Sequence, residues 1–75
     1  MSYLLIEEDG VTRIAANLVL SNGDSVYAEV PVQSGDTEAD YEQILIDRTL
    51  LQFKEYDAEG NEMPLGFTVT SVTQP

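Results

Sequence analysis

The side chains that carry most enzyme chemistry are missing from this chain of 75 residues. It contains no histidine and no cysteine, and its only basic residues are Arg13, Arg48 and Lys54. Without imidazole or thiol groups, the usual general bases and activated nucleophiles are absent. Lys54 stands beside Glu55 in a predicted strand, where an ordinary surface ion pair is the expected role. We therefore predict a protein that is not an enzyme, with no catalytic residues and no cofactor.

The segment 57–62, with the sequence DAEGNE, is the closest approach to a metal-binding pattern. It places oxygen ligands at alternating positions around Gly60, as a calcium loop does, but it lacks the remaining ligands and the length of an EF-hand loop. Asp57 and Asn61 are also typical turn residues, and glycine suits a position of positive φ. We interpret the segment as a hairpin loop and predict no metal site.

Acidic residues dominate the charge of the chain. Fourteen acids against three basic residues give a net charge of −11 at pH 7. Phosphate contacts need clustered Lys and Arg, so direct nucleic-acid binding is not expected, and anionic lipid would be repelled. Twelve of the acids fall in three clusters, at residues 7–9, 36–47 and 55–62. They could imitate a nucleic-acid backbone, or they could form only a solvated surface that keeps the protein soluble.

The N-terminus, MSYLLIEE, has no basic leader, and its apolar run is only four residues long. Such a run is too short for a signal peptide, and no other stretch is long enough to span a membrane. We expect a cytoplasmic protein, or a component of a virion assembled there, that is not secreted by a signal peptide.

Length and composition predict a single acidic β-rich domain over residues 1–75. Hydrophobic residues make up 43% of the chain, which is too many for a disordered acidic tail. A domain of this size buries only about 60% of the surface of its unfolded chain. Because no disulfide can form, further stability must come from good packing, a hard cation or a partner chain.

Three strands are predicted in the first half. Asp9-Gly10 indicates a two-residue hairpin turn that sets Glu8 opposite Val11 and Leu5 opposite Ile14. The next turn surrounds Asn22-Gly23, and a loop with an odd number of residues sets Leu18 opposite Ala28. A loop of odd length places the aliphatic side chains on one face of the sheet, whereas a shift of the register by one residue would distribute them over both faces.

Residues 38–48 can be read in two ways. Thr37 and Asp40 form a weak capping box, and a stripe at helical spacing follows, which comprises Tyr41, Ile44, Leu45 and Arg48. Ile46 breaks the stripe and is expected to point away from it. The alternative is a long strand that starts near Gln43. We favour the short helix.

The last third predicts a hairpin around a three-residue loop at 58–60, with Gly60 at positive φ. The register sets Asp57 opposite Asn61, Phe53 opposite Leu65 and Leu51 opposite Phe67. On this register Phe53 and Phe67 should be largely buried. The predicted fold class is therefore mainly β (β-rich α+β): a small antiparallel sandwich or open barrel with a three-strand meander, one short helix and a C-terminal hairpin.

The reverse face of the meander is unusually apolar, since it carries Leu4, Ile6, Ala15, Val19 and Tyr27. A solvated face should be polar, so either the helix or another chain must cover it. We expect part of a candidate interface to contact another chain, and its members are Leu4, Ile6, Val19, Tyr27 and Ile46.

These features predict a structural or protein-interaction subunit of a homo-oligomer or larger assembly. Small, free-standing acidic chains are typical of compact viral genomes, which favours a bacteriophage virion component such as a head-decoration or tail accessory protein. The alternative is an acidic nucleic-acid mimic that inhibits a host nucleic-acid-binding enzyme. The salt dependence of binding would separate the two functions.

Overall fold

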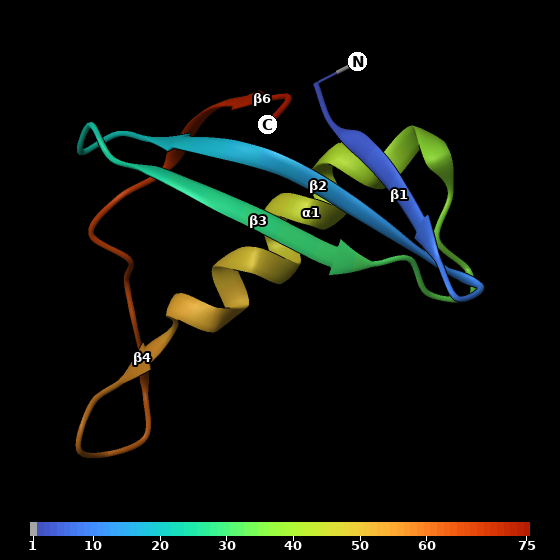
Figure 1. Cartoon of the computed structure of the whole chain (residues 1–75). Helices are drawn as coiled ribbons and strands as arrows, with labels where there is room; N and C mark the ends of the chain where they lie inside the picture. The colour runs from blue at the N-terminus through green and yellow to red at the C-terminus, as the bar shows by residue number, and fades with distance from the viewer. Residues whose placement is uncertain (1) are drawn as a thin grey trace.

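A four-stranded antiparallel sheet with one helix across one of its faces forms the body of the molecule (Figure 1). The computed structural model describes residues 2–75. The strands of this sheet are β1 (Leu4–Glu8), β2 (Val11–Leu20), β3 (Ser25–Pro31) and β6 (Val69–Thr73). The helical segments are η1 (Glu38–Asp40), α1 (Tyr41–Leu50) and η2 (Leu51–Phe53), and a separate two-stranded sheet pairs β4 (Glu55–Tyr56) with β5 (Glu62–Met63).

The predicted fold class is confirmed, because the chain is strand-rich, antiparallel and carries one α-helix. The sheets are not closed into a barrel, and the layer that packs on the larger sheet is α1. Within residues 2–75, no helix has the length and apolar character needed to cross a membrane.

The ten-residue strand β2 is the centre of the sheet. One of its edges pairs with β3, while β1 and β6 share the other edge, opposite residues 11–15 and 17–20 respectively. The two ends of the chain therefore lie close together (Figure 1), and the Gln74 Nε2 amide donates a hydrogen bond of 3.4 Å to the carbonyl oxygen of Tyr3. The predicted three-strand meander is present, and β6 extends it.

The turn between β1 and β2 confirms the predicted register. Glu8 is opposite Val11 and Leu5 is opposite Ile14. Both turn residues have positive φ, 52° at Asp9 and 77° at Gly10. This is the conformation that a two-residue Asp-Gly hairpin turn requires.

The turn between β2 and β3 has the predicted odd length but a different register. Leu18 lies opposite Val26, not opposite Ala28 as expected, and Ala16 is the residue opposite Ala28. The Leu20 amide donates to the Asp24 carbonyl at 2.8 Å, which closes a three-residue loop with Gly23 at a φ of 93°. A shift of two residues keeps every side chain on the same face of the sheet. Burial of the hydrophobic side chains therefore decides only whether the loop has an odd or an even number of residues, and the turn itself decides the register.

Residues 41–50 are helical, as favoured, but the buried side of α1 differs from the predicted stripe. Its most buried residues are Leu45 and Thr49, with 0% and 4% of their surface exposed. Residues advance by 100° around a helix, so this buried side is rotated toward Ile46. Ile46 therefore packs against the core, and the expectation that it points away from the packed side is wrong. The Thr37 hydroxyl donates to the Asp40 carboxylate at 2.7 Å and makes no capping bond to the backbone.

The C-terminal hairpin is much shorter than predicted. Its loop is correct: the Asp57 amide donates to the Asn61 carbonyl at 2.9 Å, and Gly60 has a φ of 83°. Only Glu55–Met63 and Tyr56–Glu62 pair beyond it, because residues 51–53 continue the helix as a 3-10 turn. The predicted burial of Phe53 is wrong, since 39% of its surface is exposed.

The core lies between α1 and the covered face of the sheet. Its members are Tyr3, Ile14, Ala16, Leu18, Leu20, Ala28, Val30 and Leu45. Every second residue of β2 from Ile14 to Leu20 belongs to this set, as the period of two in a strand requires. The opposite face of the same strands is the apolar reverse face of the meander, and α1 does not cover it.

Candidate interaction surfaces

The side of the four-stranded sheet that faces away from α1 is here called the open face. Figure 1 looks onto it, with α1 behind the sheet and no other described element crossing in front. Its residues alternate with the core residues and comprise Leu4, Ile6 and Glu8 of β1, Val11, Arg13, Ala15, Asn17 and Val19 of β2, Ser25, Tyr27, Glu29 and Pro31 of β3, and Ser71 and Thr73 of β6. Leu4 is 41% exposed and Tyr27 is 53% exposed, while Ile6 and Val19 are partly exposed.

The structure therefore brings together four of the five residues predicted for an interface, namely Leu4, Ile6, Val19 and Tyr27. Leu4 and Glu29 lie opposite Ala15, which is fully buried although no element covers it, while Val19 lies four residues further along β2, beyond Asn17. Ile46 does not join them, because α1 lies on the other side of the sheet and holds Ile46 against the core. Ile46 is thus excluded from this surface by its place in the fold.

Polar groups on the open face interact with one another. The Tyr27 hydroxyl donates a hydrogen bond of 2.8 Å to Glu29, and the Arg13 Nε atom lies 3.7 Å from the other oxygen of that carboxylate. The hydrogen bond to Glu29 raises the pKa of Tyr27, so the hydroxyl remains a neutral donor. The charges of Arg13 and Glu29 offset each other, and Glu8 leaves the open face with one net negative charge on a molecule with a net charge of −11.

A second apolar surface lies on the segment 51–68, here called the arm. The arm leaves the end of α1, turns through the β4–β5 hairpin and returns to the sheet at β6 (Figure 1). Four of its large hydrophobic side chains are well exposed: Leu51 at 57%, Phe53 at 39%, Tyr56 at 62% and Met63 at 43%. The arm makes the molecule long, with a radius of gyration of 13.7 Å. A compact domain of 75 residues would have about 11 Å.

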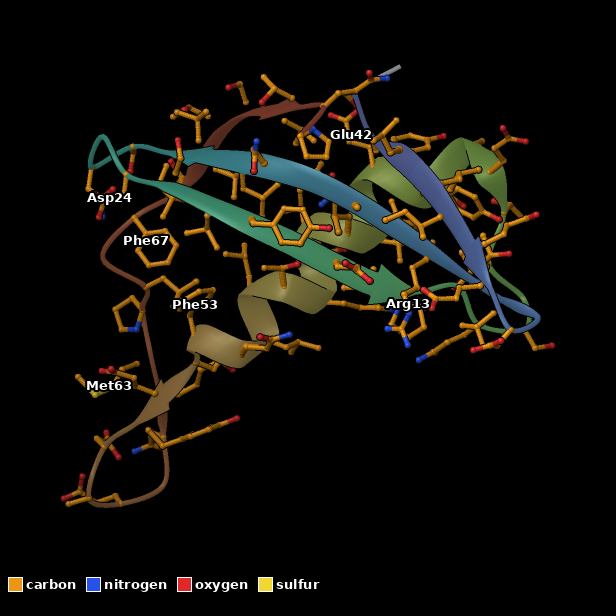
Figure 2. The ribbon with its side chains drawn as sticks, in the orientation of Figure 1. Arg13, Asp24, Glu42, Phe53, Met63 and Phe67 are labelled. Atoms are coloured by element: carbon orange, nitrogen blue, oxygen red, sulfur yellow. The ribbon has the colours of Figure 1, made fainter. Side chains whose placement is uncertain are left out.

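A shallow cleft of about 170 Å³ lies at the base of the arm. Phe53 and Phe67 form part of its wall, with ring centroids 5.8 Å apart in an edge-to-face arrangement (Figure 2). Glu55 and Met63 are directly opposite in the hairpin and both line this cleft, so Tyr56 and Glu62 project from the other side of the ribbon. The two sides of the arm therefore differ, and the cleft side is the more apolar.

Each of the three basic side chains is within ion-pair distance of an acid. Lys54 forms a surface ion pair, as expected, but its partner is Glu62 across the hairpin, at 3.1 Å from Nζ, and not the adjacent Glu55. The third basic residue, Arg48, holds Asp36 through two hydrogen bonds of 2.8 Å. These bonds, with a further one from the Gln33 amide, lower the pKa of Asp36.

The calcium-like segment has the geometry of a turn. The Asp57 carboxylate accepts hydrogen bonds from the amides of Glu59 at 3.0 Å and Asn61 at 2.9 Å, which occupies it within its own loop. In the part of the chain that the structure describes, no three acidic side chains converge as a metal site would require. Asp57 therefore stabilises the loop, and the other acids of this segment add to the negative surface charge.

The sequence did not indicate the exposed surface of the arm, because the predicted hairpin extended back to Leu51 and placed Phe53 on a buried face. One available signal was the segment Pro64-Leu65-Gly66, which interrupts a regular strand soon after β5. Comparison with known proteins supplies no further guide: no family model, characterised protein or solved structure matches this chain.

Proposed function

We propose that this protein is a non-enzymatic structural subunit that associates with further copies of itself through the open face. The observation that carries this proposal is the apolar character of that face. Antiparallel sheets commonly bury one face and present polar residues on the other. Here the second face presents Leu4, Ile6, Val19 and Tyr27, with Arg13, Asn17 and Glu29 between them.

Two further features support an assembly. Exposed hydrophobic side chains gather on one face, among them Leu4 and Tyr27, and a polar rim around such side chains is typical of interaction surfaces. The core is also small, since among residues 2–75 nine hydrophobic residues are buried and three of them are alanines. Covering the open face would add apolar burial to a domain whose own core is marginal. The virion setting stays a prediction that rests on length and composition.

Two adjacent leucines of β1 provide a matched test. Leu4 is 41% exposed on the open face, and Leu5 is 40% exposed on the opposite side of the same strand. Leu4→Glu should convert an oligomer into a folded monomer of 8.3 kDa, whereas Leu5→Glu should leave the oligomer intact. Light scattering after size exclusion measures the mass, and circular dichroism verifies folding.

The outcome that contradicts the proposal is equally direct. A wild-type protein that stays monomeric at all accessible concentrations, or a Leu4→Glu variant that folds and still assembles, would remove the open face as the interface. Assembly should also change little with moderate salt. A nucleic-acid mimic would instead bind a basic partner with an affinity that falls steeply as salt rises.

A further inference from the structure

We propose that Asn22 is a site of spontaneous deamidation, a reaction that the turn between β2 and β3 carries out on its own backbone. Asn22 is the one asparagine of the chain that precedes a glycine, whereas Asn17 and Asn61 precede a leucine and a glutamate. The inference is independent of the proposed assembly, because both reacting groups belong to the same loop.

The reaction joins the side chain of Asn22 to the backbone that follows it. The amide nitrogen of Gly23 gives its proton to hydroxide and attacks the Asn22 Cγ atom, which forms a C–N bond and closes a succinimide ring. The bond between Cγ and Nδ2 breaks, and ammonia leaves after taking a proton from water. Water then adds to one of the two ring carbonyls and opens the ring, which leaves aspartate or isoaspartate in place of Asn22.

The first structural argument is the position of the Asn22 side chain. Its Oδ1 atom accepts a hydrogen bond of 2.9 Å from the Asp24 amide, which is the arrangement of an Asx turn. The ring that this bond closes passes through the nitrogen of Gly23, so the bond holds Cγ on the side of the attacking atom and lowers the entropy cost of attack. The Asp24 amide also points at the oxygen that becomes negatively charged during the attack, and a backbone donor in that place stabilises the charge.

The second argument is access for hydroxide and water. Residues 21–25 are all exposed, and their turn lies at one end of the sheet, where Figure 2 labels Asp24. Beyond its chain neighbours, Gly23 has no atom within 4 Å of the place where a Cβ would stand. One restraint opposes the attack, since the Gly23 amide donates a hydrogen bond of 3.0 Å to the Leu20 carbonyl. This bond lies in an exposed loop, so it opens at a low free-energy cost.

The other two asparagines lack this arrangement. Asn17 lies within β2 between the paired strands β3 and β6, and the nitrogen that follows it belongs to the buried Leu18. The Asn61 amide donates to the Asp57 carboxylate at 2.9 Å, and the side chain of Glu62 hinders attack by the nitrogen that follows Asn61. Deamidation should therefore be selective for Asn22.

Both products change the loop that sets the register of β2 and β3. Each adds a carboxylate beside Asp24, and isoaspartate also lengthens the main chain of this three-residue loop by one carbon. The loop also anchors the segment before β6, since the Ser21 amide donates to the Thr68 carbonyl at 2.8 Å and the Thr68 amide donates to the Ser21 hydroxyl at 2.9 Å. The deamidated protein should therefore unfold at a lower urea concentration than the intact protein.

The experiment incubates the wild-type protein at mildly alkaline pH and follows its mass. The expected result is the mass change of a single deamidation, which fragmentation of proteolytic peptides assigns to Asn22, with Asn17 and Asn61 unchanged. The added charge lets anion exchange separate the deamidated form, whose urea midpoint is then compared with that of the intact form. Asn22→Gln is the matched control, because it keeps a side-chain amide but needs a larger ring, so its mass should stay constant.

A parallel incubation in urea gives the behaviour of the same sequence without the folded turn. If the urea-unfolded chain is deamidated at Asn22 while the folded protein stays intact, the bond between Gly23 and Leu20 protects the turn and the proposal fails. Equal modification of Asn61 in the folded protein would also overturn it, because the turn would then confer no selectivity. Loss of the amide at residue 22 of Asn22→Gln at the wild-type rate would exclude ring closure as the route.

Discussion

Replacing Leu45 by alanine tests whether α1 is held on the sheet by the core described above. Leu45 is fully buried and is the one large hydrophobic side chain of α1 with no exposed surface. Its cluster includes Ala16 and Ala28, which lie opposite each other in the middle of the covered face. The small side chains of these alanines leave room for larger members of the same cluster, and Leu45 is the one that α1 supplies.

The expected magnitude follows from the atoms removed and from the packing around them. Leu45→Ala deletes three carbon atoms, which at about 0.8 kcal/mol each is about 2.4 kcal/mol of transfer free energy. A cavity adds to this loss, and alanine methyl groups cannot swing into the space. We therefore expect a loss of about 3–4 kcal/mol, within the range of about 2–5 kcal/mol typical of buried leucine. A domain of this length has roughly 4–11 kcal/mol of stability in total.

Urea unfolding followed by circular dichroism measures the effect. The substitution is made in the monomeric Leu4→Glu background, so that loss of assembly does not contribute to the free energy of unfolding. Leu51→Ala, at a side chain that is 57% exposed, serves as the control and should change stability by less than about 0.5 kcal/mol. The reasoning is refuted if Leu45→Ala costs no more than Leu51→Ala, because α1 would then not be docked on the sheet.

Two further substitutions probe single polar groups. The Thr49 hydroxyl is buried with no hydrogen-bond partner among residues 2–75, so Thr49→Val should raise the urea midpoint by the equivalent of about 1 kcal/mol; a lower midpoint would mean that the hydroxyl is bonded after all. Arg48 lowers the pKa of Asp36 below its ordinary value of 3.8, so the folded state favours the ionised carboxylate. The stability from Asp36 is therefore present above about pH 4 and lost as the pH falls through the lowered pKa. Unfolding of the wild type and Asp36→Asn should differ at pH 6 and converge toward pH 2–3, and a constant difference would contradict the link to Arg48.

Much of the local structure could be predicted from the sequence, because it depends on neighbouring residues. The Asp9-Gly10 turn fixed the β1–β2 register, and the period of two in β2 identified the core side chains from Ile14 to Leu20. The same alternation identified Leu4, Ile6, Val19 and Tyr27 as one surface. The absence of histidine and cysteine follows from composition alone.

Other features depended on contacts between distant residues. Both faces of the meander are apolar, so the sequence could not decide which one α1 covers; packing of Leu45 and Thr49 decided it and drew Ile46 to the core. Strand β6 adds to β2 across some fifty residues, with the Thr70 hydroxyl bonded at 3.0 Å to the carbonyl oxygen of Val19, and no local pattern encodes such a partner.

The arm is a further case in which the local sequence was not sufficient to predict the structure. The turn of its hairpin could be predicted because Gly60 and Asp57 specify it locally. The length of the hairpin strands could not, since the residues before β4 are compatible with the end of a helix and with the start of a strand. The tertiary structure chose the helix and left Phe53 and Met63 exposed. Sequence periodicity determines which side chains share a face, whereas long-range packing determines which of those faces is covered.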